Sequence, residues 1–154
     1  MTGSLLLAAA VLHGLRLARW RGLATWREPL LFVLHVGYGW LVVAFALLGL
    51  ETLDLAGVSA LSPVHALTAG AFGTMTLAVM SRAILGHGGH ALSADAGTVT
   101  VFLLVTVAAL LRVALPGDLT AMTLAGGFWT AAFDLFLVCY LPRCWRRRGD
   151  RMAG

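Results

Sequence analysis

Long apolar stretches alternate with short polar connections five times along the chain. A helix rises about 1.5 Å per residue, so about 20 apolar residues cross a hydrocarbon layer of roughly 30 Å. The sequence therefore predicts an all-α, polytopic transmembrane helix bundle. Its expected spans, about five in number, cover residues 4–18, 30–50, 64–85, 98–115 and 119–141.

Prolines and glycines mark several ends of these spans. Pro29 lies where a first helical turn tolerates proline, and Pro142 is expected to stop the last span. The first stretch is short and reaches Ala18 only if Arg16 extends its charged guanidinium to the membrane surface.

No basic region precedes the first stretch, which disfavours a cleaved signal peptide. We therefore expect the chain to begin at the outer surface or to be the end of something longer. We expect a single transmembrane domain over residues 1–154, with a basic cytoplasmic tail at 142–154.

The composition requires lipid as a partner. Of 154 residues, 60% are apolar and only 12% are charged, which is more apolar surface than a core of this size can bury. The net charge of +4 comes from arginine alone, and its placement indicates membrane orientation and contact with headgroups, not nucleic-acid binding. Cys139 and Cys144 match no zinc or CxxC spacing, so we expect both to be unpaired.

Arginine positions predict the orientation of the bundle. Five spans place ten of the eleven arginines on one side of the membrane, if Arg82 is counted there, and only Arg112 on the other. Cytoplasmic loops carry the excess of basic residues in membrane proteins. The C-terminus is therefore predicted to be cytoplasmic and the N-terminus to be outside.

The third span is expected at the centre of the bundle. Ala66, Gly70 and Thr74 recur every four residues, with Ala69 and Gly73 beside them. Small side chains at this spacing let a second helix approach closely, which matters in lipid because apolar side chains alone drive little association there.

Five histidines lie in or beside the spans. His13, His35, His87 and His90 fall toward the cytoplasmic half, whereas His65 begins the third span on the outer side. Each is either a hydrogen-bonded interior residue or a ligand, and intramembrane polar groups tend to mark cofactors or relays. Tyr38 shares a helix face with His35, three residues away. His87 and His90 form either a copper or zinc pair or a solvated loop.

Asp134 is a carboxylate near the middle of the fifth span. Insertion of such a group costs roughly 2.5 to 3.5 kcal/mol, so it needs a partner or a proton. We predict that Asp134 pairs with Arg82 or accepts the ring proton of His35, which lie at a similar depth. The alternative is a protonated or water-bound aspartate. No pattern identifies a catalytic acid, base or nucleophile, so whether the protein is an enzyme stays open.

The segment HALTAGAFGTMTLAVMSRAILGHGG, from His65 to Gly89, resembles the characteristic segment of the NnrS family of bacterial membrane proteins. The flanking pieces LHGLRLARWRG from Leu12, PLLFVLHVGYGW from Pro29 and LLRVALP from Leu110 agree with that resemblance. Family members are considerably longer, and this chain is similar only to their last five spans.

The resemblance implies an inner-membrane protein that contains haem b and copper and is linked to nitric oxide metabolism and protection against nitrosative stress. The histidines at positions matching the family are His13, His35, His65 and His87, and His90 departs from the pattern. Among these, His65 and then His35 are the favoured haem ligands. They lie near opposite membrane faces, so they should not share one haem, and His13 or His87 would be the second ligand of the inner site. His65, His35 and His87 are also the candidates for copper, with Asp134, Arg82 and Tyr38 as polar support.

A rival interpretation is a non-catalytic membrane scaffold without a cofactor. There the histidines only hydrogen-bond to neighbouring helices, and small-residue faces mediate assembly with a second copy or with the missing N-terminal helices of a longer protein. An ion or small-molecule pathway lined by His35, Asp134 and Arg82 ranks last, because the chain has no evident inverted repeat.

Overall fold

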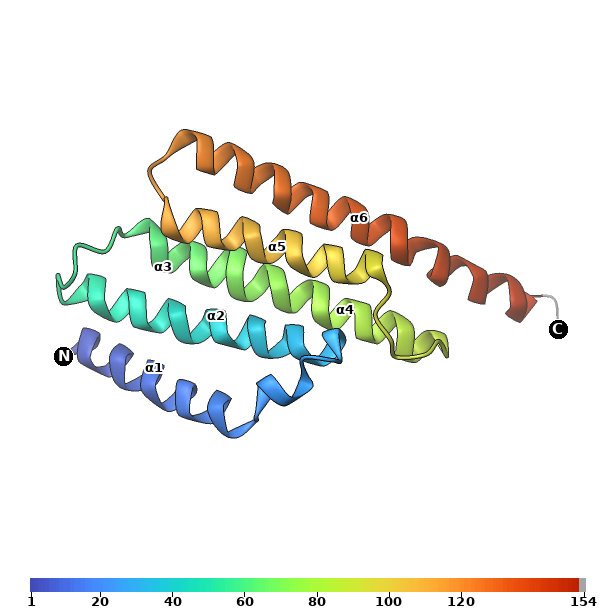
Figure 1. Cartoon of the computed structure of the whole chain (residues 1–154), viewed down its shortest axis with the longest axis horizontal. Coiled ribbons are helices and arrows are strands. Elements are labelled where there is room, and N and C mark those ends of the chain that lie inside the picture. The colour runs from blue at the N-terminus through green and yellow to red at the C-terminus, as the bar shows by residue number, and fades with distance from the viewer. Residues whose placement is uncertain (153–154) are drawn as a thin grey trace.

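The computed structural model describes the backbone of residues 1–152 and the side chains of residues 1–144. Figure 1 shows long helices lying side by side in the order of the sequence, with the two termini at opposite ends. No strand occurs within the described residues. The elements are α1 (Thr2–Arg19), the short 3₁₀ helix η1 (Gly22–Thr25), α2 (Pro29–Thr52), α3 (Leu61–His65), the π-helical turn η2 (Ala66–Phe72), α4 (Gly73–Gly88), α5 (Ala96–Ala114) and α6 (Leu119–Met152).

Four helical segments of the described chain are long and apolar enough to cross a membrane. They are Pro29–Thr52, Leu61–Gly88, Ala96–Ala114 and Leu119–Cys144. The predicted all-α membrane bundle is therefore confirmed. The first predicted span also forms a helix, α1, but its 18 residues are not among the four. Its 18 residues are about as long as α5, but His13, Arg16 and Arg19 make it less apolar than the four, so its role as a fifth span stays a prediction.

Helix ends agree with the sequence signals except at Pro142. Pro29 begins α2 at its first turn, and Asp95 caps α5 by accepting a hydrogen bond from the Thr98 backbone N–H at 2.8 Å. The prediction that Pro142 ends the last helix is wrong, because α6 continues through it to Met152. A proline inside a helix removes one backbone hydrogen bond, and α6 tolerates that loss. The side chains of residues 145–154, most of the predicted basic tail, lie outside the described residues.

The segment Leu61–Gly88 lies at the centre of the bundle, as predicted. It contacts α2 on one side and α5 on the other, and α4 also reaches α6. A Cβ atom added to Gly70 would lie 2.6 Å from Cδ2 of Trp40, and one added to Gly37 would lie 2.8 Å from Cγ of Met75. Two glycines, one on each helix, therefore let α2 and the central segment pack at close range.

The turn η2 interrupts the central segment, which the sequence predicted as one regular α-helix. A π turn closes its hydrogen bonds over five residues, one more than an α turn, and such turns are frequent at functional sites. Within the turn, Gly70 packs against Trp40 of α2. Directly after it, Gly73 faces Val105 of α5 and Trp129 of α6. Small residues in and directly after the turn therefore allow helices to approach from two directions.

Side chains connect α5 to α6 near the ends where α5 begins. Asp95 accepts a hydrogen bond from Nη2 of Arg143 at 2.6 Å, which is the only salt bridge among the described side chains. About one helical turn away from this salt bridge, the hydroxyls of Thr98 and Tyr140 lie 2.8 Å apart. The Arg143 guanidinium also lies over the Tyr140 ring. The pKa of Asp95 is lowered to about 2, first by the Thr98 backbone N–H and then by Arg143. Cys139 and Cys144 are both free, as predicted.

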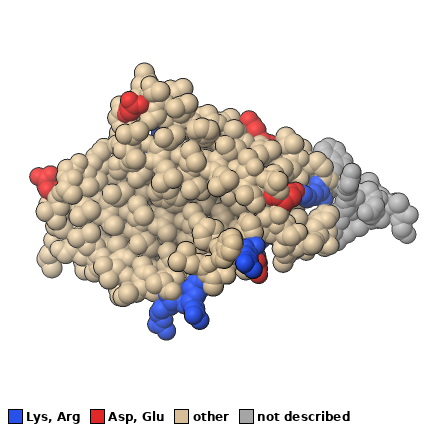
Figure 2. All heavy atoms as spheres, viewed as in Figure 1, with Lys and Arg blue, Asp and Glu red and all other residues tan. Residues whose placement is uncertain are grey.

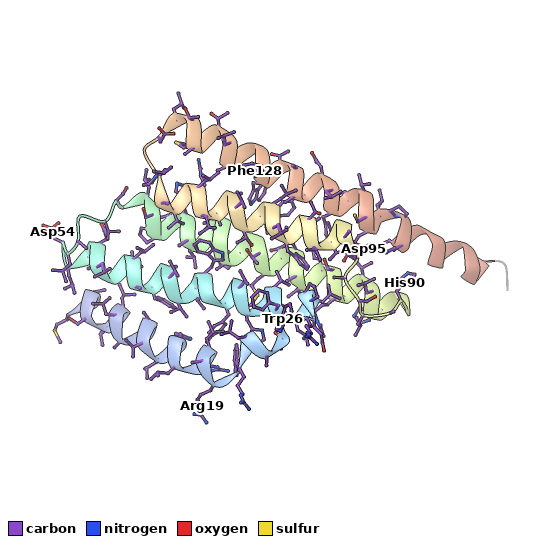
Figure 3. All side chains as sticks on the ribbon, viewed as in Figure 1. Arg19, Trp26, Asp54, His90, Asp95 and Phe128 are labelled. Atoms are coloured by element: carbon purple, nitrogen blue, oxygen red, sulfur yellow. The ribbon has the colours of Figure 1, made fainter. Side chains whose placement is uncertain are left out.

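Charged side chains are confined to parts of the surface. On the face that Figure 2 shows, basic groups lie along the lower and right-hand parts, acidic groups lie at the left and also near the basic ones at the right, and a broad uncharged area lies between the two ends. Figure 3 places Arg19 and Trp26 at the turn between α1 and α2, and Asp54 at the opposite end. We call the end with the α1–α2 turn the arginine-rich end and the end with Asp54 the arginine-poor end.

Gly70→Ala should lower the stability of the bundle. The added Cβ collides with the Trp40 indole, and overpacking of this kind costs about 1–3 kcal/mol. Gly127→Ala is the matched control, because a Cβ there meets nothing within 4 Å on α6. Thermal unfolding in mild detergent should show a lower midpoint for Gly70→Ala only. Equal midpoints in the two variants would contradict the close packing at Gly70.

Protonation of Asp95 should weaken the connection between α5 and α6. Because its folded pKa is lowered from 3.8 to about 2, the carboxylate stabilises the fold above about pH 4, and this contribution is lost as the pH falls toward 2. The difference in unfolding midpoint between the unsubstituted protein and Asp95→Asn should therefore shrink over that interval. The exposed acid Asp54, changed to Asn, is the control. A difference that stays constant from pH 6 to pH 2 would refute the assignment.

Candidate functional site

Five aromatic and imidazole rings meet between α1 and α2, and four of them carry polar atoms. Nδ1 of His13 lies 2.6 Å from the hydroxyl oxygen of Tyr38, and the ring of His13 stacks on Phe45. Trp20 contacts the rings of both Tyr38 and His35, with centroid distances of 4.8 and 6.2 Å. His13, Trp20, His35 and Tyr38 are called the α1–α2 cluster below. It forms because His35 and Tyr38 share the face of α2 that is turned to α1.

His35 is held in one tautomer by its own helix. Its Nδ1 lies 3.0 Å from the carbonyl oxygen of Leu31, one turn earlier in α2. A carbonyl only accepts hydrogen bonds, so Nδ1 must carry the proton and the neutral ring keeps its lone pair on Nε2. Within the described residues Nε2 has no hydrogen-bond partner. This is the state in which imidazole binds a metal, with its other nitrogen oriented by a backbone carbonyl.

A cavity of about 410 Å³ adjoins His35 between the end of α1 and the start of α2. The backbone of Gly22 lies against the ring, since a Cβ on Gly22 would be 2.6 Å from Cδ2 of His35. Arg21, in a left-handed conformation with φ of 53°, contributes the single charged group. The other residues are mainly apolar, and the full lining is Leu17, Ala18, Arg21, Gly22, Leu23, Phe32, His35 and Val36. We call this space the His35 cavity.

His65 lies in a different cavity, near the arginine-poor end. This space of about 340 Å³ lies between the central segment, α5 and α6, and we call it the His65 cavity. Its lining is more polar than that of the His35 cavity, with Thr68, Arg112, Trp129 and Thr130 around His65, and its remaining residues are Ala69, Ala108, Ala125 and Gly126. The two favoured histidines therefore line separate spaces, in keeping with the expectation that they do not share a cofactor.

The other predicted site residues do not converge. His87 and His90 are both exposed at the end of α4, where Figure 3 shows His90, and the ring of His90 lies against the backbone of Gly88. Among the described residues, no group of three or more histidine, cysteine or acidic side chains is placed to hold a metal ion. The loop therefore offers at most two imidazoles to copper, which by themselves do not define a site.

The predicted pairing of Asp134 is wrong. Asp134 is exposed on α6 and makes no hydrogen bond or ion pair with any side chain of residues 1–144. Arg82 instead lines a separate space with Arg27 and Glu28. The prediction rested on similar depth in the membrane, but the carboxylate points away from the bundle, and depth alone does not decide which way a helix faces.

Sequence reasoning missed Arg112 and Trp129 as site residues. Arg112 was noted only as the one arginine on the arginine-poor side, and Trp129 not at all. The isolation of Arg112 from the other arginines was a usable signal, because an arginine that does not contribute to orientation needs another explanation. Its position beside His65 depends on how α5 packs against α3, which the sequence does not show.

These features define a polytopic helical membrane protein with histidine-lined cavities near both ends. A model of the NnrS family, described as NnrS protein, matches residues 1–148. The chain therefore belongs to the NnrS family. No curated protein and no solved structure matches the chain.

Proposed function

We propose that this NnrS-family protein is a haem protein of the bacterial inner membrane, linked to nitric oxide metabolism or to protection against nitrosative stress. The observation that carries the proposal is the orientation of His35. Its Nδ1 is engaged by the Leu31 carbonyl, so its Nε2 is free to ligate iron beside an apolar cavity. Neutral imidazole is a normal axial ligand of haem iron. Family membership and this geometry together support the proposal of a haem, and the proposed link to nitric oxide rests on family membership alone.

The residues around His35 suit a b-type haem. Phe32, Val36 and Leu17 would cover the macrocycle and exclude water, and Arg21 at the edge would accept a propionate as its ion-pair partner. Trp20 and the Gly22 backbone hold the imidazole in place from two sides. Haem bound here would be held by His35 and would supply an iron centre with affinity for small diatomic molecules.

His35 is a better haem ligand than His65, which reverses the order that the sequence suggested. The ring of His65 has no hydrogen bond to fix its tautomer within the described residues, and it shares its cavity with the guanidinium of Arg112. The lining of the His65 cavity is also the more polar of the two, whereas a haem macrocycle needs apolar side chains around it. His13 is also less suited, because the Tyr38 hydroxyl beside its Nδ1 can donate or accept and so does not fix the tautomer. His13 is also not among the residues that line the His35 cavity. Copper has less support than haem, since no three ligands converge in the described part.

Removal of the His35 imidazole should abolish haem retention. Protein purified in mild detergent from cells supplied with haem should show a Soret band, and His35→Ala should lose most of it because the axial ligand is gone. Gly22→Ala should weaken the band by displacing the His35 ring. His90→Ala, which changes an exposed loop histidine, is the matched control and should retain the full band per mole of protein.

The variant His65→Ala tests which of the two histidines binds the haem. Retention of the Soret band in this variant, together with its loss in His35→Ala, supports the assignment. The reverse pattern, or a colourless preparation of folded protein, would contradict it.

A second candidate function is assembly without a cofactor, favoured by the outer face of α6. Thr123, Gly127, Ala131 and Asp134 share one side of the helix at helical spacing, and all four are exposed. A carboxylate facing lipid is unfavourable, whereas another helix could approach closely over such small residues. A colourless protein that forms a defined oligomer, and that Ala131→Leu dissociates, would favour this function over haem binding.

A further inference from the structure

We propose that the His65 cavity binds a planar monovalent oxyanion, either a carboxylate or a nitrogen oxyanion. This inference does not depend on haem binding at His35, because the two cavities share no residue. It rests on three features of the His65 cavity: the charge of its lining, the free hydrogen-bond donors in it, and the small residues that leave room for a ligand.

The lining carries one permanent positive charge and no acid. Arg112 is half-buried in the last turn of α5, and none of the residues that line the cavity is aspartate or glutamate. No acidic group lies within salt-bridge distance of Arg112 among the described side chains. Charged groups within membrane spans generally face a cavity and find a counter-charge there. A single anion in the cavity would supply that counter-charge.

Several hydrogen-bond donors in the cavity are also unengaged. Within the described residues, the side chains of Arg112, Trp129, Thr130 and His65 donate no hydrogen bond to another side chain or to the backbone. Thr130 differs in this from Thr68, Thr106 and Thr123, which each donate to the carbonyl four residues earlier. The side chains available to a ligand are thus hydrogen-bond donors without negative charge, and such groups are suited to bind an anion.

Shape favours a planar anion over a spherical one. A guanidinium presents two parallel N–H groups that match the two oxygens of a carboxylate, and the same spacing occurs in nitrite and nitrate. One fixed positive charge matches a monoanion better than a phosphate dianion. Space comes from the small residues Ala69, Ala108, Ala125 and Gly126, and a Cβ on Gly126 would meet nothing within 4 Å.

Isothermal titration calorimetry of the purified protein in neutral detergent tests the site. Sodium nitrite and sodium acetate are the probes, and sodium chloride is the spherical control. We expect saturable binding of nitrite or acetate and much weaker binding of chloride. Tighter binding of nitrite would assign the site to nitrogen oxyanions, and tighter binding of acetate would assign it to carboxylates. Absence of saturable binding by both, or equal binding of chloride, would overturn the proposal.

Two variants test the positive charge and the free volume of the His65 cavity separately. Arg112→Gln should weaken binding at least about tenfold, because a charged hydrogen-bond partner is lost. Gly126→Leu should weaken it by filling the cavity. The matched controls are Arg19→Gln, an exposed arginine near the other end, and Gly127→Leu, the neighbouring open glycine that does not line the cavity.

Both controls should bind as the unsubstituted protein does. Unchanged affinity in Arg112→Gln, in protein whose unfolding midpoint is also unchanged, would refute the site. The absorbance spectrum of the same samples reports haem content separately. A failure at His35 and a failure at the His65 cavity are therefore distinguishable.

Discussion

Close packing of α2 against the central segment is the contact on which the rest of the structure depends. In lipid, apolar side chains gain little by leaving their surroundings, so helices associate through tight packing and hydrogen bonds. Here Gly70 receives the Trp40 indole, and Gly37 receives Met75 from the other direction. The buried residues of α2 that meet the central segment follow one helical stripe, namely Val33, Gly37, Trp40 and Ala44. That stripe fixes the rotation of α2 about its own axis.

The rotation of α2 places its polar residues. With Gly37 and Trp40 turned inward, His35 and Tyr38 face α1, where Trp20 and His13 meet them. On the far side of the central segment, η2 turns Gly73 toward α5 and α6, next to the space that His65 and Arg112 share. The same central helix therefore separates a mainly apolar cavity at one end from a cationic cavity at the other. This separation is the reason that we propose different ligands for the two histidines.

Much of the fold could be predicted from sequence, because length, hydropathy and small-residue spacing act locally. The helices, the start of α2 at Pro29 and the central position of Gly70 all followed from such patterns. Two features could not be predicted in this way, namely the continuation of α6 through Pro142 and the π turn η2, since both depend on neighbouring helices. The site was predicted less well. Counting residues gave the depth of Asp134 but not its direction, and the meeting of Arg112 with His65 depends on helix packing.

The visible absorption spectrum of the reduced protein, recorded before and after addition of nitric oxide, tests the central claim most directly. If His35 is the only protein ligand of a bound haem, as proposed, the iron would be able to bind nitric oxide, so we predict a Soret band that shifts when nitric oxide is added. A protein that has no Soret band despite an adequate haem supply, or a band that nitric oxide leaves unchanged, would contradict it.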